Sequence, residues 1–187
     1  MAEPLALWHA DHVVFGRLLD LLEIQVAAFH AGERPNYELM TDIVDYLRQY
    51  GDRFHHPREE AAFCRLVERD PEMRLPVNRL LQEHRVIARA GDDVLERLGE
   101  VADDVMTERA DVEAAAATYL VYYRHHLATE EGKIMPLAKE LLTGDDWAAA
   151  GEAVQGAPDP LSGVDFDERY RELRKHIALH PAKPRAQ

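Results

Sequence analysis

Cysteine, basic residues and long apolar runs are all scarce in this chain of 187 residues. Its one cysteine, Cys64, leaves no disulfide possible within the chain, and the lack of a CxxC pair indicates a reducing compartment. There are 22 Lys and Arg against 35 Asp and Glu, which gives a formal net charge of −13. This balance argues against nucleic acid as a partner and against docking on anionic lipid, because both need a basic surface.

The sequence also lacks membrane, secretion and catalytic signals. The longest apolar run, AAAATYLVYY, contains a threonine and is far shorter than a membrane span. No basic n-region with a long apolar stretch opens the chain, so we expect a cytoplasmic protein without a membrane partner. HExxH, G-x-S-x-G and a Gly-rich phosphate loop are all absent, and the sequence predicts no catalytic residue. The absence of E-x-x-H counts against the ferritin-like carboxylate pattern.

What the chain does contain is a series of long amphipathic segments. Apolar residues recur at helical spacing, as in the stripe of Leu18, Leu19, Leu22 and Val26. The pattern predicts four helices over residues 5–29, 36–68, 71–101 and 111–142, with Asp111 as an N-cap. No segment alternates with period two. These features predict an all-α, antiparallel up-down four-helix bundle over residues 1–144. Residues 145–187 are expected to form a C-terminal helical extension, with two short helices and a frayed tail at 181–187.

Histidine is unusually frequent, with ten residues, and four of them form two HH pairs. HHPREE at 55–60 recurs as HHLATEE at 125–131. His56 and His126 are 70 residues apart, as are Glu60 and Glu130, while His12 and His84 are 72 apart. The first and second pairs of helices therefore resemble two related hairpins, each with one His on its first helix and one H-x-x-x-E on its second.

These repeated residues predict a metal site inside the bundle. Residues i and i+4 share one face of a helix, and each of these histidines lies in the apolar stripe of its helix. Buried imidazoles and carboxylates are costly without partners, and two metal ions would satisfy them together. The mixed nitrogen and oxygen donors favour iron over a four-coordinate zinc site. The predicted metal ligands are His12, His56, Glu60, His84, His126 and Glu130. Their neighbours His55, Glu59, His125 and Glu131 are expected to support the ligands or to lie at the rim.

Pro57 interrupts the second predicted helix directly after the two histidines. A proline inside a helix removes one hydrogen bond and kinks the chain. Our hypothesis is that this kink turns His56 toward the metals and holds the turn that carries Glu60.

With these motifs identified, the chain resembles the hemerythrin-like (HHE cation-binding) family. The matching elements are DH at 11–12, HHPREE at 55–60, EHR at 83–85 and HHLATEE with KIMP at 125–136, within residues 5–142. The resemblance implies a bundle that holds two non-haem iron ions with oxo or hydroxo and carboxylate bridges. It places terminal ligands on His12, His56, His84 and His126, and bridging carboxylates on Glu60 and Glu130.

The motifs depart from those of the oxygen-carrying relatives at two places. Those proteins have two histidines on the third helix, whereas only His84 is present here, so one iron is expected to keep an open position. The spacing in the carriers would select Glu131 as second carboxylate, whereas the internal repeat favours Glu130. The cysteine-containing N-terminal segment of the cluster-repair relatives is absent before His12, which weakens that role.

We therefore expect a di-iron protein that binds or senses O₂ or NO, or that handles iron under oxidative or nitrosative stress. Any turnover would be a reaction with oxygen, NO or peroxide. The alternative is an iron-responsive interaction module whose folding or partner binding depends on metal loading. A metal-free structural bundle is a third reading. The protein partner is not identified by the sequence.

Overall fold

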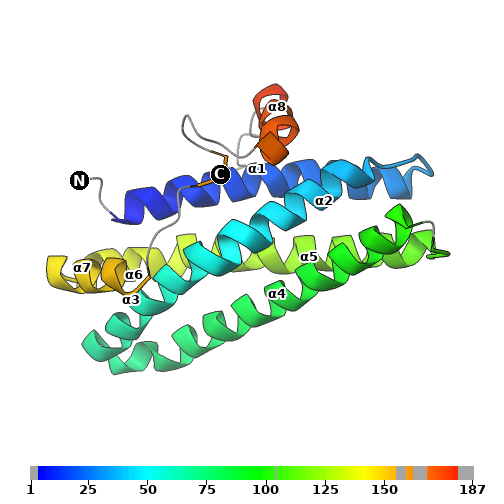
Figure 1. The fold of residues 1–187 in the computed structure, drawn as a ribbon. Coiled ribbons are helices and arrows are strands. Elements are labelled where there is room, and N and C mark those ends of the chain that lie inside the picture. The colour runs from blue at the N-terminus through cyan, green and yellow to red at the C-terminus, as the bar shows by residue number, and fades with distance from the viewer. Residues whose placement is uncertain (1–3, 104, 155–158, 162–167, 181–187) are drawn as a thin grey trace.

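Four helical rods lie side by side in the computed structural model, which describes residues 4–103, 105–154, 159–161 and 168–180 (Figure 1). The first rod is α1 (Pro4–His30), and the second joins α2 (Tyr37–Tyr46), the π-helix η1 (Leu47–His55) and α3 (His56–Arg69). The third consists of the 3₁₀ turn η2 (Pro71–Met73) and α4 (Arg74–Ala102). The fourth joins α5 (Arg109–Thr129), the π-helix η3 (Glu130–Ile134) and α6 (Met135–Leu141). The predicted all-α bundle is confirmed, and the described residues include no strand.

The connections between the rods follow ordinary capping chemistry. Gly32 adopts a φ of 74° after α1, a conformation that glycine reaches without steric cost. Asn36 then caps α2 by accepting a hydrogen bond from the backbone N–H of Leu39. The predicted N-cap at Asp111 is wrong, because α5 begins two residues earlier and Glu108 takes the cap position. Asp111 lies in the first turn instead, where its negative charge still favours the helix N-terminus.

The C-terminal region adds the two short helices that were expected. In α7 (Gly144–Ala153), the Thr143 side chain and Asp146 form a reciprocal capping box, and the helix packs against α3. The turn η4 (Glu168–Tyr170) and α8 (Arg171–Leu179) pack on α1 and α2, as the top of Figure 1 shows. Leu173 is fully buried there, and the Tyr170 hydroxyl donates to Asp45 at 2.7 Å. The predicted tail at 181–187 lies outside the described residues.

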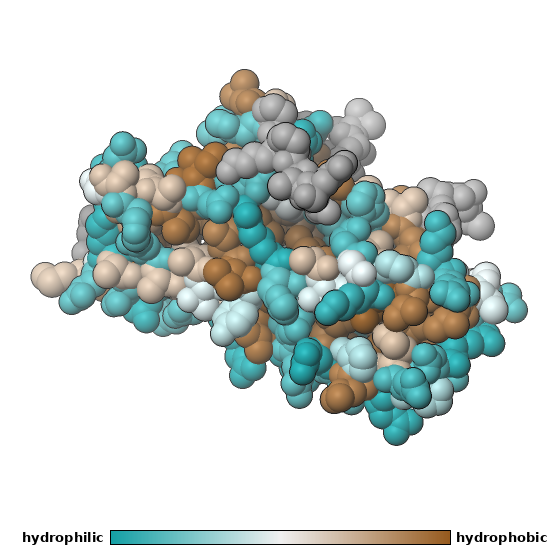
Figure 2. All heavy atoms as spheres, turned by 180° about the vertical axis from the view of Figure 1, so that it is seen from behind, coloured by the Kyte–Doolittle hydropathy of each residue, from teal (hydrophilic) through white to brown (hydrophobic). Residues whose placement is uncertain are grey.

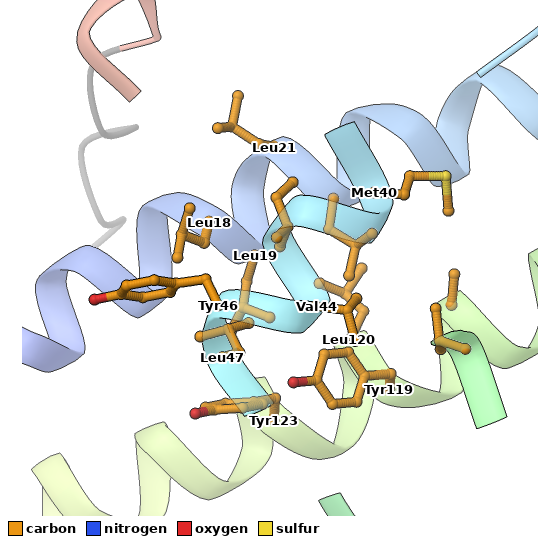
Figure 3. Close-up of a cluster of buried hydrophobic side chains, with 14 of the residues drawn as sticks. Leu18, Leu19, Leu21, Met40, Val44, Tyr46, Leu47, Tyr119, Leu120 and Tyr123 are labelled. Atoms are coloured by element: carbon orange, nitrogen blue, oxygen red, sulfur yellow. The ribbon is translucent and has the colours of Figure 1, made fainter. Parts of the chain in front are cut away.

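Two hydrophobic clusters fill the bundle. The larger one contains side chains from α1, α2, η1, α4, α5 and α8, including Leu18, Leu19, Tyr46 and Tyr119 (Figure 3). The smaller cluster contains residues of α1, α3, η2, α4, η3, α6 and α7, and one residue directly after α6: Leu5, Trp8, Ala62, Phe63, Leu66, Met73, Val77, Leu80, Ile134, Met135, Ala138, Leu142 and Ala150. Buried polar side chains from all four rods belong to neither cluster. The interior thus has apolar parts and a polar part, and the polar part contains the functional candidates.

The outer surface carries mainly charged and polar side chains. Figure 2 views the molecule from behind and shows hydrophilic groups over much of this face, with hydrophobic groups between them. Scattered exposed apolar residues of this kind are normal for a folded domain. Among the described residues, no helix combines the length and the apolar character that crossing a membrane requires.

Two of the rods contain a π-helix followed by a proline. Pro57 stands in the first turn of α3 directly after η1, and Pro136 stands in the first turn of α6 directly after η3. At each junction the backbone bond skips one residue further back, as from the N–H of His56 to the carbonyl of Gly51. Proline lacks the N–H that would continue an α-helix, so it fits this change of pattern. Each π-helix adjoins an H-x-x-x-E motif, since η1 ends at His55 and η3 begins at Glu130. Single π-turns are frequent at functional sites.

Candidate metal centre

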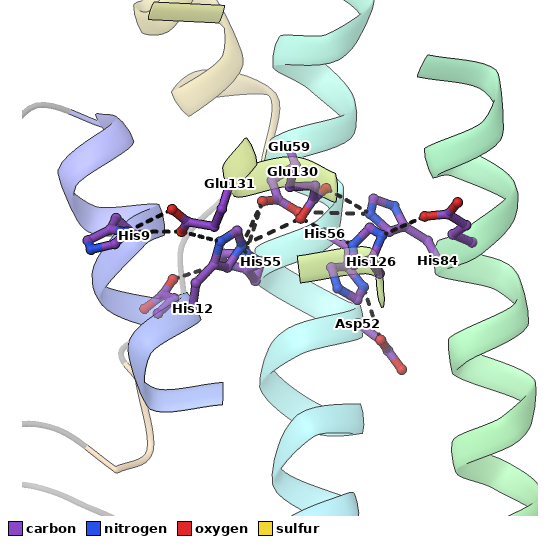
Figure 4. Close-up of polar contacts among 12 residues, drawn as sticks. His9, His12, Asp52, His55, His56, Glu59, His84, His126, Glu130 and Glu131 are labelled. Atoms are coloured by element: carbon purple, nitrogen blue, oxygen red, sulfur yellow. Dashed lines mark hydrogen bonds and ion pairs between the residues drawn. The ribbon is translucent and has the colours of Figure 1, made fainter. Parts of the chain in front are cut away.

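Seven polar side chains from the four rods converge in the interior (Figure 4). We call this group the cage, and its members are His12, His55, His56, Glu59, His84, His126 and Glu130. Their side chains are between 0 and 5 % exposed to solvent. Burial of so many ionisable groups is costly unless they satisfy one another or hold a cation.

The donor atoms of the cage form two groups that share one carboxylate. His56, Glu59, His84 and His126 each offer an atom within 4.8 Å of the others, and so do His12, His55 and Glu59. Glu59 belongs to both groups, and its Oε1 lies 3.2 Å from His12 Nε2 and 3.0 Å from His55 Nε2. A carboxylate in this position is suited to bridge two cations.

Glu130 also lies between the two groups. Its Oε2 is 3.5 Å from His12 Nε2 and 3.2 Å from His126 Nε2, while its Oε1 is 3.6 Å from His84 Nε2. The cage therefore has two shared carboxylates, with three imidazoles on one side and two on the other.

Every imidazole of the cage is held from behind by a carboxylate. The pairs of Nδ1 and carboxylate are His12 with Glu131 at 2.8 Å, His55 with Asp11 at 2.9 Å, His56 with Asp52 at 3.0 Å, His84 with Glu60 at 2.9 Å and His126 with Glu83 at 3.2 Å. A neutral imidazole that donates from Nδ1 has its lone pair on Nε2. The five rings thus present Nε2 to the centre, which is the usual arrangement of histidines that bind metal.

The contact between His12 and His55 requires a positive charge. Their Nε2 atoms are 2.9 Å apart, while both Nδ1 atoms face carboxylates. With the protons on Nδ1, two lone pairs would face each other at this distance. A proton or a metal cation on Nε2 removes that repulsion.

Six further cage atoms are in hydrogen-bond geometry with no described residue. They are Nε2 of His56, His84 and His126, Oε2 of Glu59, and both carboxylate oxygens of Glu130. All six are potential metal donors, and unpaired buried polar atoms are rare in folded proteins. With five imidazoles and two carboxylates, the cage fits a pair of cations that accept both nitrogen and oxygen ligands.

Without metal, protons take the place of cations. Burial alone lowers the pKa of His12, but hydrogen bonds to Glu131 and Glu59, with the charges of the cage carboxylates, raise it to about 10. Burial likewise opposes the charged form of His126, and Glu130 and Glu83 raise the pKa of this imidazole to about 10.

The pKa values of His56 and Glu130 are both lowered, through different neighbours. The pKa of His56 falls well below its usual value, because burial and the charges of His84 and His126 oppose its protonation. Burial and the charge of Glu59 favour a protonated Glu130, but His126 and His84 outweigh them and lower the pKa of this carboxyl to about 2. The metal-free cage therefore combines imidazolium and carboxylate groups with a neutral His56.

The structure brings together five of the six predicted ligands: His12, His56, His84, His126 and Glu130. It places Glu60 outside the cage, with a side chain 43 % exposed that accepts a hydrogen bond from His84 Nδ1. Glu59 occupies the interior position expected for Glu60. His55, expected beside the ligands, also enters the cage. Glu131 supports His12 from behind, as expected of a supporting residue, and His125 is exposed.

The register of the internal repeat explains this difference. Doubled HH and EE allow an offset of 70 or of 71 residues. In the structure, His55 and Glu59 contact each other at 3.0 Å as His126 and Glu130 do at 3.2 Å. The two H-x-x-x-E units are therefore related by the second offset. Glu59 follows His55 by four residues and His56 by three, so it shares a helix face with both.

Comparison with known proteins identifies a family for this chain. The family model described as Hemerythrin HHE cation binding domain matches residues 3–138. A search of curated proteins finds no match. The resemblance drawn from the sequence motifs is confirmed by the family match.

The stability of the metal-free protein should depend on pH in a defined direction. The pKa values of His12 and His126 are near 10 when folded and 6.5 when unperturbed, so their contribution is complete below pH 6.5 and is lost as the pH rises to about 10. The low pKa of Glu130 adds stability above pH 4.5 that is lost as the pH falls to about 2. The melting temperature of metal-free protein should be highest between these limits, at about pH 4.5–6.5. A melting temperature that stays constant as the pH rises from 6.5 to about 10 would contradict the protonation of His12 and His126 in the metal-free cage.

Proposed function

The chain belongs to the hemerythrin HHE cation-binding family, and from this premise we propose that its cage holds two non-haem iron ions and binds O₂ or NO. The observation that carries the proposal is the convergence of five Nε2 atoms on two shared carboxylates. In this proposal the protein binds or senses a diatomic gas, or handles iron under oxidative or nitrosative stress.

The proposed ligands differ from the sequence-based set at two residues. In this proposal His56, His84 and His126 would hold one ion, His12 and His55 would hold the other, and Glu59 and Glu130 would contact both. Glu60 becomes the partner that orients His84. This proposal is supported by the shared position of Glu59 in both donor groups and by the 2.9 Å contact between Glu60 and His84 Nδ1.

Iron fits the donor set by charge as well as by atom type. Imidazole suits iron, copper, zinc and nickel, and carboxylates suit harder cations, so the mixture favours iron. Two cage carboxylates surround the centre, together with the five carboxylates that hold the imidazoles from behind. In the described part of the chain, Arg48, which donates to Asp52, is the only arginine with a hydrogen bond or ion pair to any of them. Two multiply charged cations offset this excess of negative charge.

The distribution of imidazoles indicates where a small ligand binds. The sequence motifs predicted an open position because only four histidines were assigned as ligands, whereas five face the cage in the structure. Three are on one side and only His12 and His55 on the other. The ion on the two-histidine side then keeps more of its coordination for an exogenous ligand. When bound, iron supplies the electrons that such a ligand accepts or shares.

The surrounding side chains limit what reaches the centre. Phe15 contacts the ring of His55 edge-on at 4.9 Å, and Tyr123 lies 5.9 Å from His56 between ring centroids. Both aromatic side chains are fully buried. An apolar wall of this kind admits a small neutral molecule more readily than a hydrated ion.

Substitution of the two adjacent glutamates tests the ligand assignment. Glu59→Gln removes a shared negative donor and should weaken iron binding by more than about 100-fold, beyond the usual effect of an outer partner. Glu60→Gln keeps a carbonyl oxygen to accept from His84 and should weaken binding by about 10-fold or less. Iron affinity is measured by competition with a chelator, and circular dichroism checks the helix content of each variant. Greater damage from Glu60→Gln would restore the sequence-based assignment.

Gas binding tests the function itself. Protein loaded anaerobically with Fe(II) should retain about two ions per chain, since the donors form two groups. Exposure to O₂ or NO should then change the visible absorption spectrum, and removal of the gas should reverse the change. Retention of iron without any spectral response would favour the alternative of an iron-responsive interaction module. Failure to retain iron would overturn both functions.

A further inference from the structure

A surface cavity of about 220 Å³ lies beside the cage but outside it. It is found at the end of the bundle drawn on the left in Figure 1, where α4 begins and η3 follows α5. Its lining residues are Leu75, Pro76, Arg79 and Leu80 from α4, and Thr129, Lys133 and Ile134 from the end of α5 and from η3. The cavity therefore joins two rods that also carry proposed metal ligands.

The lining is mainly apolar and includes two basic residues. Leu80 and Ile134 are 1 % and 2 % exposed and belong to the smaller hydrophobic cluster, while Leu75 is 74 % exposed. Arg79 and Lys133 are both exposed, and no ion pair or hydrogen bond joins either side chain to another described residue. Two unpaired cations at one cavity are notable in a chain with a net charge of −13.

We propose that this cavity binds a free alkyl carboxylate of medium chain length. The alkyl chain lies on Leu75, Pro76, Leu80 and Ile134, and the carboxylate lies between Arg79 and Lys133. Apolar walls with a few convergent polar groups are typical of sites for small amphipathic ligands. Arginine and lysine both bind carboxylates through charge-assisted hydrogen bonds. An inorganic anion would leave the apolar lining unused.

The site is separate from the proposed iron centre. Leu80 is one helical turn before His84, and Ile134 follows Glu130 by four residues. Both are buried side chains that line the cavity, and none of the seven cage residues lines it. The proposal therefore does not depend on iron, and binding is expected in metal-free protein as well as in loaded protein.

Calorimetric titration of the full chain with octanoate tests the proposal. One octanoate should bind per chain, with or without iron. The double substitution Arg79→Glu with Lys133→Glu should weaken binding by at least about tenfold, because it removes two charge-assisted contacts. Arg89→Glu with Lys139→Glu is the matched control. It changes the net charge equally on exposed positions of the same rods and should alter binding by less than about twofold.

Neutral and inorganic probes complete the test. Octanamide, acetate and sulfate should each bind at least about tenfold more weakly than octanoate, because each lacks either the charge or the chain. Equal binding of octanamide, or unchanged affinity in the cavity variant, would overturn the proposal. Equal binding of sulfate would show an anion site without an apolar component and would also overturn it. Octanoate binding that requires iron would place the carboxylate on the metal instead.

Discussion

The pairing of each imidazole Nδ1 with an outer carboxylate is the interaction on which the centre depends. Five such contacts, between 2.8 and 3.2 Å long, fix the direction of five Nε2 atoms. Their acceptors come from all four rods, since Asp11 is on α1, Asp52 on η1, Glu83 on α4 and Glu131 on η3. In four of the five contacts the imidazole and its carboxylate are on different rods. Assembly of the cage and assembly of the bundle are thus parts of one process.

The same arrangement relates metal binding to stability. The larger hydrophobic cluster contains Phe15 and Tyr123, the smaller contains Trp8 and Leu80, and the cage contributes no apolar area between them. Burying charged groups in this region is costly in itself, so the metal-free fold relies on its imidazolium and carboxylate pairs. A ligand that binds only the folded state adds about 2.7 kcal/mol of stability at a concentration 100 times its dissociation constant. Since metal competes with protons for the same nitrogens, its contribution grows as the pH rises.

The sequence was sufficient to predict the four rods, and the convergence of His12, His84 and His126 on one interior point. Helical periodicity and the repeat contain that information, because a buried histidine must lie on the apolar stripe. Helical periodicity could not decide whether Glu59 or Glu60 faces the interior, because HH and EE are compatible with two registers of the repeat. The register depends on η1, whose π-turns change the direction of every later side chain. Pro57 marked the interruption without specifying its geometry. The acceptors Asp11 and Glu83 could not be assigned either, since their contacts span 44 and 43 residues and depend on how the rods pack.

The central claim is that two cations share Glu59 and Glu130. Anomalous diffraction at the iron absorption edge, from crystals of the iron-loaded protein, tests it most directly. The account predicts two anomalous peaks inside the bundle. One is bound by Nε2 of His56, His84 and His126, the other by Nε2 of His12 and His55, and oxygens of Glu59 and Glu130 contact both. A single peak, or a pair in which Glu60 replaces Glu59, would contradict it.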